Sequence, residues 1–342
     1  METLPIEIFE MICKDSNGVD ANNLMLSSKT LYAHRNGLSK WICNPVKMKR
    51  NKIPSNIPLC FPISLNLNGN LNTKDLLVSE NIHTLTLDCM PNVLDVSIFG
   101  NVHTLTLQHI YQISDVSALG NVHTLMLCNM INVSDVLALG NVHTLTLCWM
   151  PNVSDVSALG NVHTLTLDHV SNVSDVSALR NVHTLTLDHV SNVLDISALG
   201  NVHTLMLYNM PNVSDVSALG NVHTLTLDAL NVCDVSALGN VHTLSLLRVP
   251  VNYVSCLKNV HTLTLKSLCL CSLEFENVHT LTLNDMYLVH DLTKIGNVHT
   301  LCLNLMDQIS YIPNTINTLK LTNCPKIQFE NIKHVFIEGI KI

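Results

Sequence analysis

A five-residue string, Asn-Val/Ile-His-Thr-Leu, occurs twelve times in this chain and constrains its fold more than any other feature. From His83 to His223 the histidine of this string recurs at a constant step of about 20 residues, and three of the next four steps are slightly shorter. A unit this short cannot bury an apolar face by itself, so successive units must stack into a solenoid. Degenerate copies at residues 63–67, 317–321 and 333–337 extend the array to about fifteen units over residues 61–342. The twelve histidines are His83, His103, His123, His143, His163, His183, His203, His223, His242, His261, His279 and His299.

Each unit contains the pattern of one strand. In residues 121–127, Leu125 and Leu127 alternate with polar or outward positions, as in a strand with one buried face. The strands of successive units are then expected to align as one parallel sheet.

A tight helical turn is expected after each strand. Val133, Val136 and Leu139 are three residues apart, which fits a 3₁₀ turn better than a strand. Asp135 stands where an N-cap would accept bonds from free amides, and Gly140 stands where a left-handed C-terminal residue is expected. The predicted fold is therefore an α/β solenoid, a horseshoe with the sheet on its concave face and 3₁₀ turns on its convex face.

This spacing resembles the leucine-rich repeat family. Leu105-x-Leu107 is similar to the strand motif of that family, and residues 113–119 resemble the I-x-D-V-x-x-L segment of its internalin-like and cysteine-containing subtypes. The family usually has Asn or Cys three residues after the strand motif, but here apolar residues stand there, so the loop carbonyls need other donors. These apolar residues are Met90, Ile110, Met130, Met150, Val170, Val190 and Met210.

Composition and charge exclude several classes of protein. The chain of 342 residues is 47% hydrophobic, 4% aromatic and 13% charged, a composition too rich in aliphatic residues for a disordered chain. Polar residues interrupt every aliphatic stretch before it reaches the ~20 residues that a membrane span needs. Residues 1–60 hold 8 Lys/Arg and 5 Asp/Glu (net +3), and residues 61–342 hold 10 and 21 (net −11). An acidic body argues against a nucleic-acid partner.

The N-terminus and the cysteines predict a cytoplasmic protein. Residues 1–10 do not have the basic and apolar regions of a secretory signal, so we expect the twelve cysteines to be reduced thiols. No two of them form a C-x-x-C pair, and the closest, Cys269 and Cys271, have one residue between them. The spacing therefore predicts neither a zinc site nor a cofactor.

Two polar columns run through the repeats. The histidines are expected to stack about 4.8 Å apart at the inner edge of the sheet, with their ring nitrogens bonded to backbone or to the neighbouring Asn column. We interpret this column as structural and expect stability to fall below about pH 6, because protonation places like charges side by side. The column of aspartates, which includes Asp135, is interpreted as helix capping, with calcium binding as the alternative.

The positions that vary between units are the candidate binding residues. They follow the strands along one margin of the sheet, and Trp149 and Tyr208 are the expected anchors because aromatic residues dominate interface energetics. The alternative is drift among duplicated units. The candidate target-binding residues are Gln108, His109, Asn129, Trp149, Asp168, His169, Asp188, His189, Tyr208 and Asn209.

The pairs Asp168-His169 and Asp188-His189 could hold a divalent ion, but duplication of one unit explains them better, so no metal site is predicted. No nucleophile with a His and an Asp stands out from the repeats, and no phosphate loop is present, so we predict no enzymatic activity.

Residues 1–45 lie outside the repeat. Pro5 is placed to start a helix, with Ile8, Phe9 and Ile12 at helical spacing, and residues 46–60 are predicted to form a linker. Residues 4–8 (LPIEI) and 24–32 (LMLSSKTLY) resemble the F-box family. That resemblance implies a small helical module that binds a Skp-type adaptor, and the alternative is a cap for the first repeat. The implied adaptor-binding residues are Leu4, Pro5, Ile6, Ile8, Phe9, Ile12, Leu24 and Leu26.

An F-box followed by leucine-rich repeats implies, by resemblance, the substrate-recognition subunit of a Skp–cullin–F-box ubiquitin ligase with a protein target. The near-identical repeats resemble proteins of giant viruses of amoebae, which implies action in the host cytoplasm. A scaffold without a ligase partner is the second hypothesis, and an internalin-like adhesin is the third.

Overall fold

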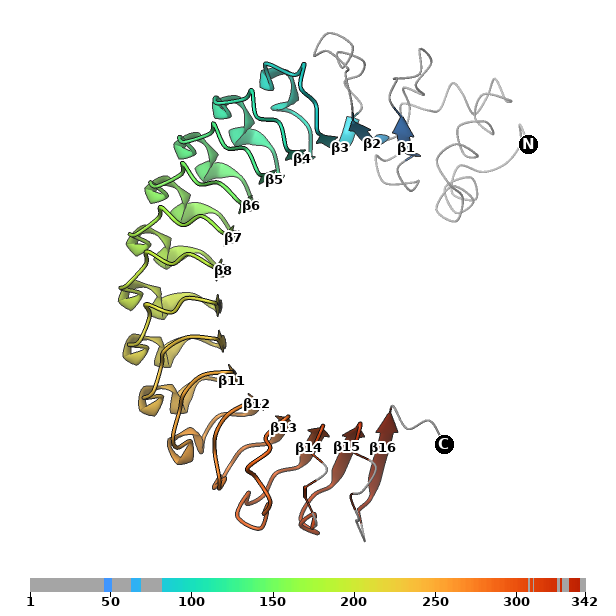
Figure 1. Ribbon diagram of the computed structural model, residues 1–342, viewed down its shortest axis with the longest axis vertical. Coiled ribbons are helices and arrows are strands. Elements are labelled where there is room, and N and C mark those ends of the chain that lie inside the picture. Colours follow the sequence, from blue (N-terminus) through green and yellow to red (C-terminus); the bar gives the residue numbers. More distant parts are fainter. Residues whose placement is uncertain are drawn as a thin grey trace, which may run out of the picture. The chain divides into compact units, whose positions relative to one another are not determined.

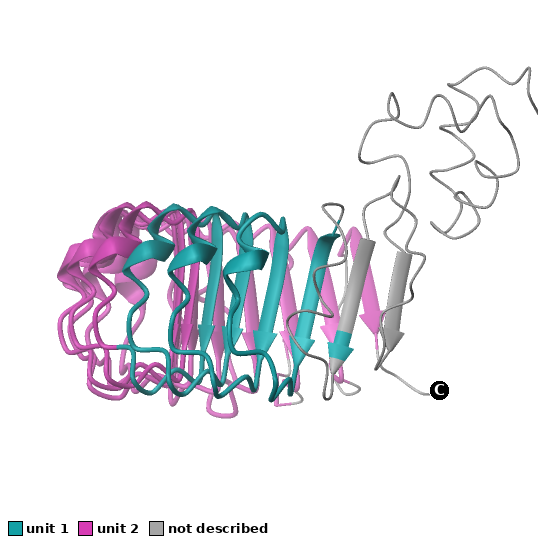
Figure 2. Ribbon diagram, turned by 90° about the horizontal axis from the view of Figure 1, so that it is seen from above, with its two compact units in different colours: residues 1–153 teal, residues 154–342 magenta. Residues whose placement is uncertain are grey.

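The computed structural model describes the backbone of residues 46–50 and 63–68, and residues 82–306, 308–309, 311–324, 327 and 332–338. The chain divides into two compact units, residues 1–153 (unit 1) and 154–342 (unit 2), which Figure 2 shows in different colours. Within each unit the strands lie side by side in one layer and the 3₁₀ turns lie on the opposite side (Figure 1). The expected solenoid of parallel strands and 3₁₀ turns is therefore confirmed.

The strands of unit 1 form a parallel sheet in chain order. Leu105 pairs with Leu85 on one side and with Leu125 on the other, so that identical residues of successive rungs are neighbours. The register shifts once, between Ile63 and Ser64. The strands are β1 (Val46–Arg50), β2 (Ile63–Asn68), β3 (Ile82–Asp88), β4 (Thr104–Gln108), β5 (Thr124–Cys128) and β6 (Thr144–Cys148). The 3₁₀ turns of this unit are η3 (Ser97–Phe99), η4 (Ser117–Asn121) and η5 (Leu137–Asn141).

Unit 2 repeats the same arrangement, and its strands are again parallel and in chain order wherever their pairing is described. The strands are β7 (Thr164–Asp168), β8 (Thr184–Asp188), β9 (Thr204–Tyr208), β10 (Thr224–Asp228), β11 (Thr243–Leu247), β12 (Thr262–Lys266), β13 (Thr280–Asn284), β14 (Thr300–Asn304), β15 (Thr318–Thr322) and β16 (His334–Glu338). The 3₁₀ turns are η6 (Ser157–Asn161), η7 (Ser177–Asn181), η8 (Ser197–Asn201), η9 (Ser217–Asn221), η10 (Ser236–Asn240) and η11 (Ser255–Leu257).

Each rung buries the apolar residues that its pattern predicts. In the rung of β5, the strand leucines and the residues spaced by three are all at most 1% exposed, and Met130 fills the position where Asn or Cys is usual. The outward-facing threonines of the strands are half-buried. The core of each unit is therefore a stack of identical apolar layers.

The three-residue spacing has a direct cause in the hydrogen bonds. The N–H of Val133 donates to the carbonyl of Met130, that of Leu139 to Val136, and that of Val142 to Leu139, at 3.0–3.1 Å. Because each bond spans three residues, every buried side chain faces the same side of the turn as the one before it.

The aspartate column accepts a hydrogen bond from a free amide at the start of these turns, as predicted, but each aspartate lies one residue before the N-cap position, which Val136 and Val216 occupy. Asp215 Oδ1 accepts from the N–H of Ser217 at 2.8 Å, and Asp135 accepts from Leu137 at 2.9 Å. The bonds from the Ser217 N–H, and then from its hydroxyl, lower the pKa of Asp215. Each carboxylate therefore satisfies an amide that has no partner within its turn.

The prediction for Gly140 was wrong. This residue belongs to η5, and among the described glycines the left-handed region is occupied by Gly296 alone, at φ 63°. The equivalent glycines of other rungs are needed for close packing instead. A Cβ placed on Gly200 would overlap the backbone oxygen of Ala218 in the next rung.

Substitution of Gly200 by alanine is therefore expected to lower the free energy of unfolding by about 1–3 kcal/mol, as overpacking does. Arg180 occupies the equivalent position of the preceding rung, which shows that neighbouring rungs can separate enough to admit a Cβ. Chemical denaturation of Gly200→Ala and Arg180→Ala measures this loss of stability. Arg180→Ala is the control, because it changes the equivalent position without adding a Cβ. An equal stability of Gly200→Ala and the unaltered chain would contradict the packing argument.

An asparagine ladder supplies the donors that the loops need. Asn132 Nδ2 donates to the carbonyl of Tyr111 and Asn152 Nδ2 to that of Ile131, both at 2.6 Å. In unit 2, Asn212 donates in the same way to Ser191 at 2.7 Å. The ladder lies two residues beyond the usual position, and the usual position is occupied by core residues.

Residues 1–45, with the proposed F-box and all eight adaptor-binding residues, lie outside the described residues. Strand β1 falls within the range 46–60 that the sequence predicts to be a linker, and it pairs in parallel with β2. The remaining domain boundaries stay predictions.

Candidate functional site

The two edges of the sheet carry different side chains. At the edge where strands begin, the histidines stack with ring centroids 4.3–4.8 Å apart in each unit, which confirms the predicted column. Their bonding differs from the expected one, because Nδ1 of His123 lies 3.2 Å from the hydroxyl of Thr124 rather than on backbone or asparagine. Most of these rings, including His203, are exposed.

At the opposite edge, each strand from β3 to β15 is followed directly by a residue with left-handed backbone. We call this edge the strand-end margin, meaning the last residue of each strand from β3 to β15 and the residue directly after it. The second residue of each pair has φ between 51° and 56°, although none is glycine. They are Cys89, His109, Asn129 and Trp149 in unit 1, and His169, His189, Asn209, Ala229, Arg248, Ser267, Asp285, Leu305 and Asn323 in unit 2.

The left-handed conformation follows from the hydrogen bonds between rungs. The N–H of His109 donates to the carbonyl of Cys128 at 3.1 Å, and the N–H of Asn129 donates to that of Cys148 at 2.8 Å. Each margin residue thus extends the ladder by one bond while the chain turns away from the sheet. Asn, Asp and His tolerate this conformation best, which accounts for their frequency in the row.

All ten predicted target-binding residues lie on this margin. Gln108, His109, Asn129 and Trp149 belong to unit 1, and the other six belong to unit 2. Four of them are strand ends, namely Gln108, Asp168, Asp188 and Tyr208, and the other six are left-handed residues. Their role in binding stays a prediction.

Several of these residues contact one another within unit 2. Asp168 accepts from His169 Nδ1 at 2.6 Å, and Asp188 lies 2.7 Å from His189 Nδ1. The rings of His169 and His189 stack at 4.1 Å. Asn209 Nδ2 also donates to Asp188, at 2.9 Å.

Tyr208 lies between acidic groups and is less accessible than Trp149. Burial raises the pKa of its hydroxyl, and the charges of Asp228 and Asp188 raise it further. Asp228 is itself paired with Arg248, whose Nε and Nη2 each donate to the carboxylate at 2.8 Å. The two predicted anchors therefore differ, since Trp149 is 53% exposed.

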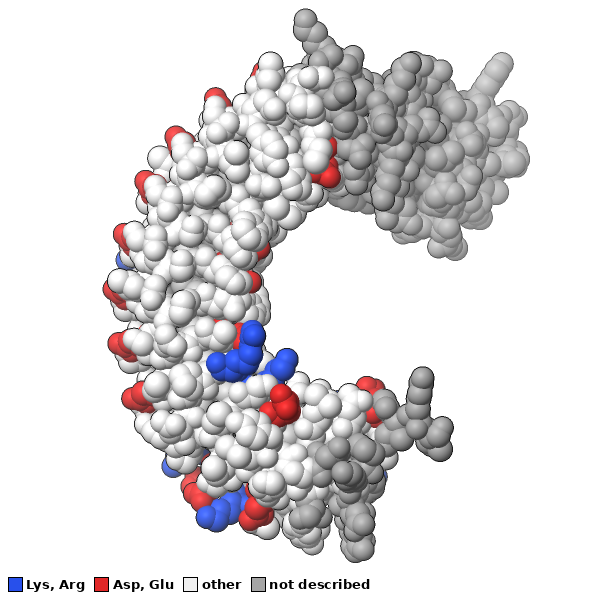
Figure 3. Space-filling model, in the orientation of Figure 1, with Lys and Arg blue, Asp and Glu red and all other residues white. Residues whose placement is uncertain are grey.

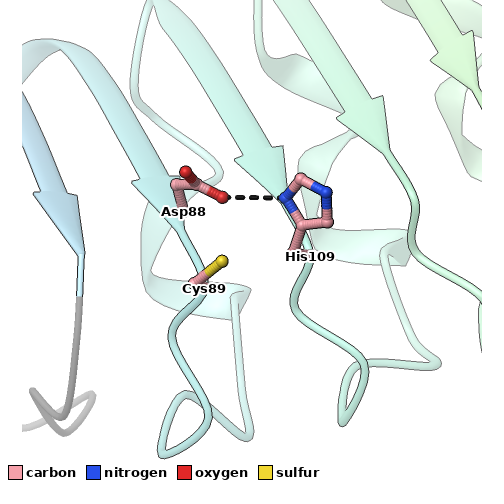
Figure 4. A group of neighbouring side chains, drawn as sticks. All are labelled: Asp88, Cys89 and His109. Atoms are coloured by element: carbon pink, nitrogen blue, oxygen red, sulfur yellow. Dashed lines mark hydrogen bonds and ion pairs between the residues drawn. The ribbon is translucent and has the colours of Figure 1, made fainter.

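Asp88 and Cys89 are among the margin residues that the prediction did not include. Asp88 ends β3 and Cys89 follows it, and they lie beside His109 of the next rung (Figure 4). The hydrogen bond between the Cys89 thiol and Asp88 raises the pKa of Cys89. Their equivalence to Gln108 and His109, one repeat later in the sequence, was the signal that would have included them.

An exposed apolar surface adjoins the margin of unit 1. Tyr111 is 41% exposed and Ile131 is 40% exposed, in the loops that follow β4 and β5. Asn129 Nδ2 lies 3.4 Å from the Tyr111 hydroxyl, which ties the margin to these loops. Trp149, Tyr111 and Ile131 are named below as the aromatic cluster.

Charge is sparse on the described surface. Acidic groups recur at regular intervals along the outer side of the turns, where the capping aspartates lie, and the rest is largely uncharged (Figure 3). The side chains of Arg248 and Lys266 supply positive charge at the margin of unit 2. The aromatic cluster therefore offers apolar surface rather than charge.

No protein-family model and no curated protein matches this chain. Solved structures that resemble it are repeat proteins of the leucine-rich class. An internalin of Listeria monocytogenes has 19% sequence identity and a TM-score of 0.45, over 81% of this chain and 82% of that one. A leucine-rich repeat protein of Leptospira interrogans has 15% identity and a TM-score of 0.49, over 88% of both chains.

The leucine-rich repeat ectodomain of a plant receptor kinase from Arabidopsis thaliana, solved in complex with CASPARIAN STRIP INTEGRITY FACTOR 2, is a further neighbour. It has 14% identity and a TM-score of 0.35, over 86% of this chain and 44% of that one. These likenesses concern the fold alone. In the described part of the chain, every helix is too short or too polar to span a membrane.

Proposed function

We propose that this chain is a non-catalytic scaffold whose protein target binds the aromatic cluster of unit 1. One observation carries the proposal. Trp149 adopts a left-handed backbone, which costs a bulky residue roughly 1 kcal/mol or more, and 53% of it is nevertheless exposed. Neither backbone preference nor burial in the core favours tryptophan at this position, whereas binding of a partner would.

The neighbouring residues support the same surface. Tyr111 and Ile131 are exposed in loops whose backbone carbonyls accept hydrogen bonds from asparagine side chains of the next rung, so the backbone that carries these two residues is held in place. A rigid aromatic anchor loses little conformational entropy on binding, and such residues supply most hot spots of interfaces.

The test is a binding comparison between Trp149→Ala and a matched exposed residue. Proteins that the unaltered chain retains from cell extract are identified, purified and titrated against each variant. Loss of a hot spot of about 2 kcal/mol or more would weaken binding roughly 30-fold or more in Trp149→Ala. Leu137→Ala removes an exposed apolar residue of the same unit from a 3₁₀ turn, and is expected to leave the affinity unchanged. Equal affinities of the two variants would contradict the proposal.

We propose further that residues 1–45 attach this scaffold to a Skp-type adaptor of a cullin–RING ubiquitin ligase in the cytoplasm. The support is the F-box resemblance of residues 4–8 and 24–32, together with the repeat array that follows them. The free cysteines of the described residues, several of them exposed, are compatible with a reducing compartment.

A direct pull-down with purified Skp adaptor tests the ligase role. The unaltered chain should retain the adaptor, and the triple variant Leu4→Ala/Pro5→Ala/Ile8→Ala should not. If the unaltered chain retains no adaptor, the ligase proposal fails while the scaffold proposal stands, and residues 1–45 would then be assigned as a cap of the solenoid.

A further inference from the structure

Three chemically different side chains converge at the first described rungs of the margin. Asp88 and Cys89 come from the end of β3, and His109 comes from the end of β4 (Figure 4). A carboxylate oxygen, the thiol sulfur and an imidazole nitrogen all lie within 4.8 Å of one another, and Asp88 Oδ1 is 2.9 Å from His109 Nδ1. Sequence spacing alone does not show this group, because His109 lies about one repeat away from the other two.

The backbone that carries these side chains is fixed by the repeat. Cys89 and His109 have φ of 52° and 53°, and their N–H groups donate to Gln108 and Cys128 of the next strand, both at 3.1 Å. The ring of His109 also packs edge-on against Tyr111, with centroids 6.4 Å apart. Only side-chain rotations are needed to close the group around an ion.

The donor set matches the preferences of zinc. Zn²⁺ binds thiolate, imidazole and carboxylate at about 2.0–2.3 Å in tetrahedral geometry, so that its ligand atoms are ~3.3–3.6 Å apart. One thiolate and one carboxylate neutralise the two charges of the ion. The side chains of His109 and Asp88 are 39% and 38% exposed and Cys89 is exposed, so an ion and a water molecule have access.

Equivalent positions elsewhere show what this place in a rung can hold. At Asp228 the cation is the guanidinium of Arg248, held by two bonds of 2.8 Å. The group of Asp168, His169 and His189 has no thiol, and its two imidazole rings stack face to face at 4.1 Å, which keeps their in-plane lone pairs parallel. Of these three groups, the one at Asp88 has a thiol, which is a soft metal ligand, together with a carboxylate and an imidazole nitrogen within 4.8 Å.

We propose that Asp88, Cys89 and His109 bind one Zn²⁺ ion, with water as the fourth ligand. On binding, the thiol proton leaves to solvent. The proton that His109 Nδ1 donates to Asp88 in the free site must also leave Nδ1, so that the neutral ring carries its single proton on Nε2 and Nδ1 takes the metal. The site adjoins the aromatic cluster, because the ring of His109 packs against Tyr111, but none of its three ligands belongs to that cluster or to the adaptor-binding segment.

The test uses the full chain, freed of metal by a chelator, and titrated with Zn²⁺ against a chromophoric chelator and with Co²⁺ as a spectroscopic probe. Bound Co²⁺ should give a near-ultraviolet thiolate charge-transfer band and the strong visible bands of four-coordination, and Zn²⁺ should abolish both. Cys89→Ser should lose the charge-transfer band. His109→Asn should weaken Zn²⁺ binding by at least about 100-fold, the upper end of the effect of losing an outer-shell partner.

The variants are chosen so that folding is preserved. Serine and asparagine occupy the same left-handed position of other rungs, at Ser267 and Asn129. Cys233→Ser, which removes an exposed thiol of unit 2, is the matched control and should keep the band and the affinity. The proposal is overturned if the unaltered chain shows no thiolate band, if the band persists in Cys89→Ser, or if His109→Asn binds Zn²⁺ with unchanged affinity.

Discussion

Truncation of Leu205 to alanine is expected to lower the free energy of unfolding by about 2–5 kcal/mol. Leu205 is fully buried in β9 and lies in register between Leu185 and Leu225. The backbone ladders on both sides prevent the rungs from collapsing into the space that the side chain leaves, so the cavity remains and its cost adds to the lost burial.

The measurement is urea denaturation followed by circular dichroism. Met206→Ala is the control, because Met206 lies on the same strand, points outward between Thr186 and Thr226, and is only half-buried. Met206→Ala should lower the free energy of unfolding clearly less than Leu205→Ala does. A solenoid can open locally, so amide hydrogen exchange in β8 to β10 is measured as well. Exchange there should be faster in Leu205→Ala than in Met206→Ala. Similar losses for both variants would refute the layered core.

The second large effect is expected from pH. Burial lowers the pKa of His103, and the neighbouring His123 lowers it further; burial and the charges of His242 and His279 act in the same way on His261. A histidine whose pKa is lower in the folded chain binds fewer protons there than in the unfolded chain. Stability is therefore complete above the unfolded value of about 6.5 and is lost as the pH falls below it.

Because the folded chain lowers the pKa of these histidines, we expect the melting temperature to fall between about pH 7.5 and 5.5. The matched variant is His242→Gln/His279→Gln, which leaves His261 without a stacked imidazole on either side. It should show a shallower dependence on pH over the same range. The Asp–His pairs of the opposite margin are present in both proteins and cancel in the comparison. A melting temperature that does not change with pH in the unaltered chain would disprove the effect.

The fold could be predicted because each rung repeats the same local sequence pattern. Alternating leucines specify a strand, apolar residues at every third position specify the 3₁₀ turn, and Asp135 caps it. These are local effects, which depend on residues close together in the chain. Stacking then multiplies one prediction over the whole array.

What could not be predicted depends on contacts between rungs. The left-handed residues arise because an amide such as that of Asn129 must reach a carbonyl of the next strand, and no local pattern marks this. The turn glycines are needed because the backbone of the next rung lies in van der Waals contact with them and leaves no room for a Cβ. The sequence of a single repeat does not show this contact either. The grouping of Asp88 and Cys89 with His109 has the same origin, since side chains one repeat apart become neighbours only when the rungs stack.

The identical register of successive rungs has a consequence for the gene as well as for the protein. Within residues 164–223, each boundary between rungs is formed by the same leucines, by the same first threonine of each strand, and by the same turn glycines or their equivalents. Loss or duplication of one whole repeat by unequal recombination would therefore join surfaces that already fit, and would change the length of the sheet without leaving a defect. Beyond residue 223 the repeats become unequal in length, which breaks this equivalence, so the number of rungs is expected to vary between alleles in the first stretch and not in the second.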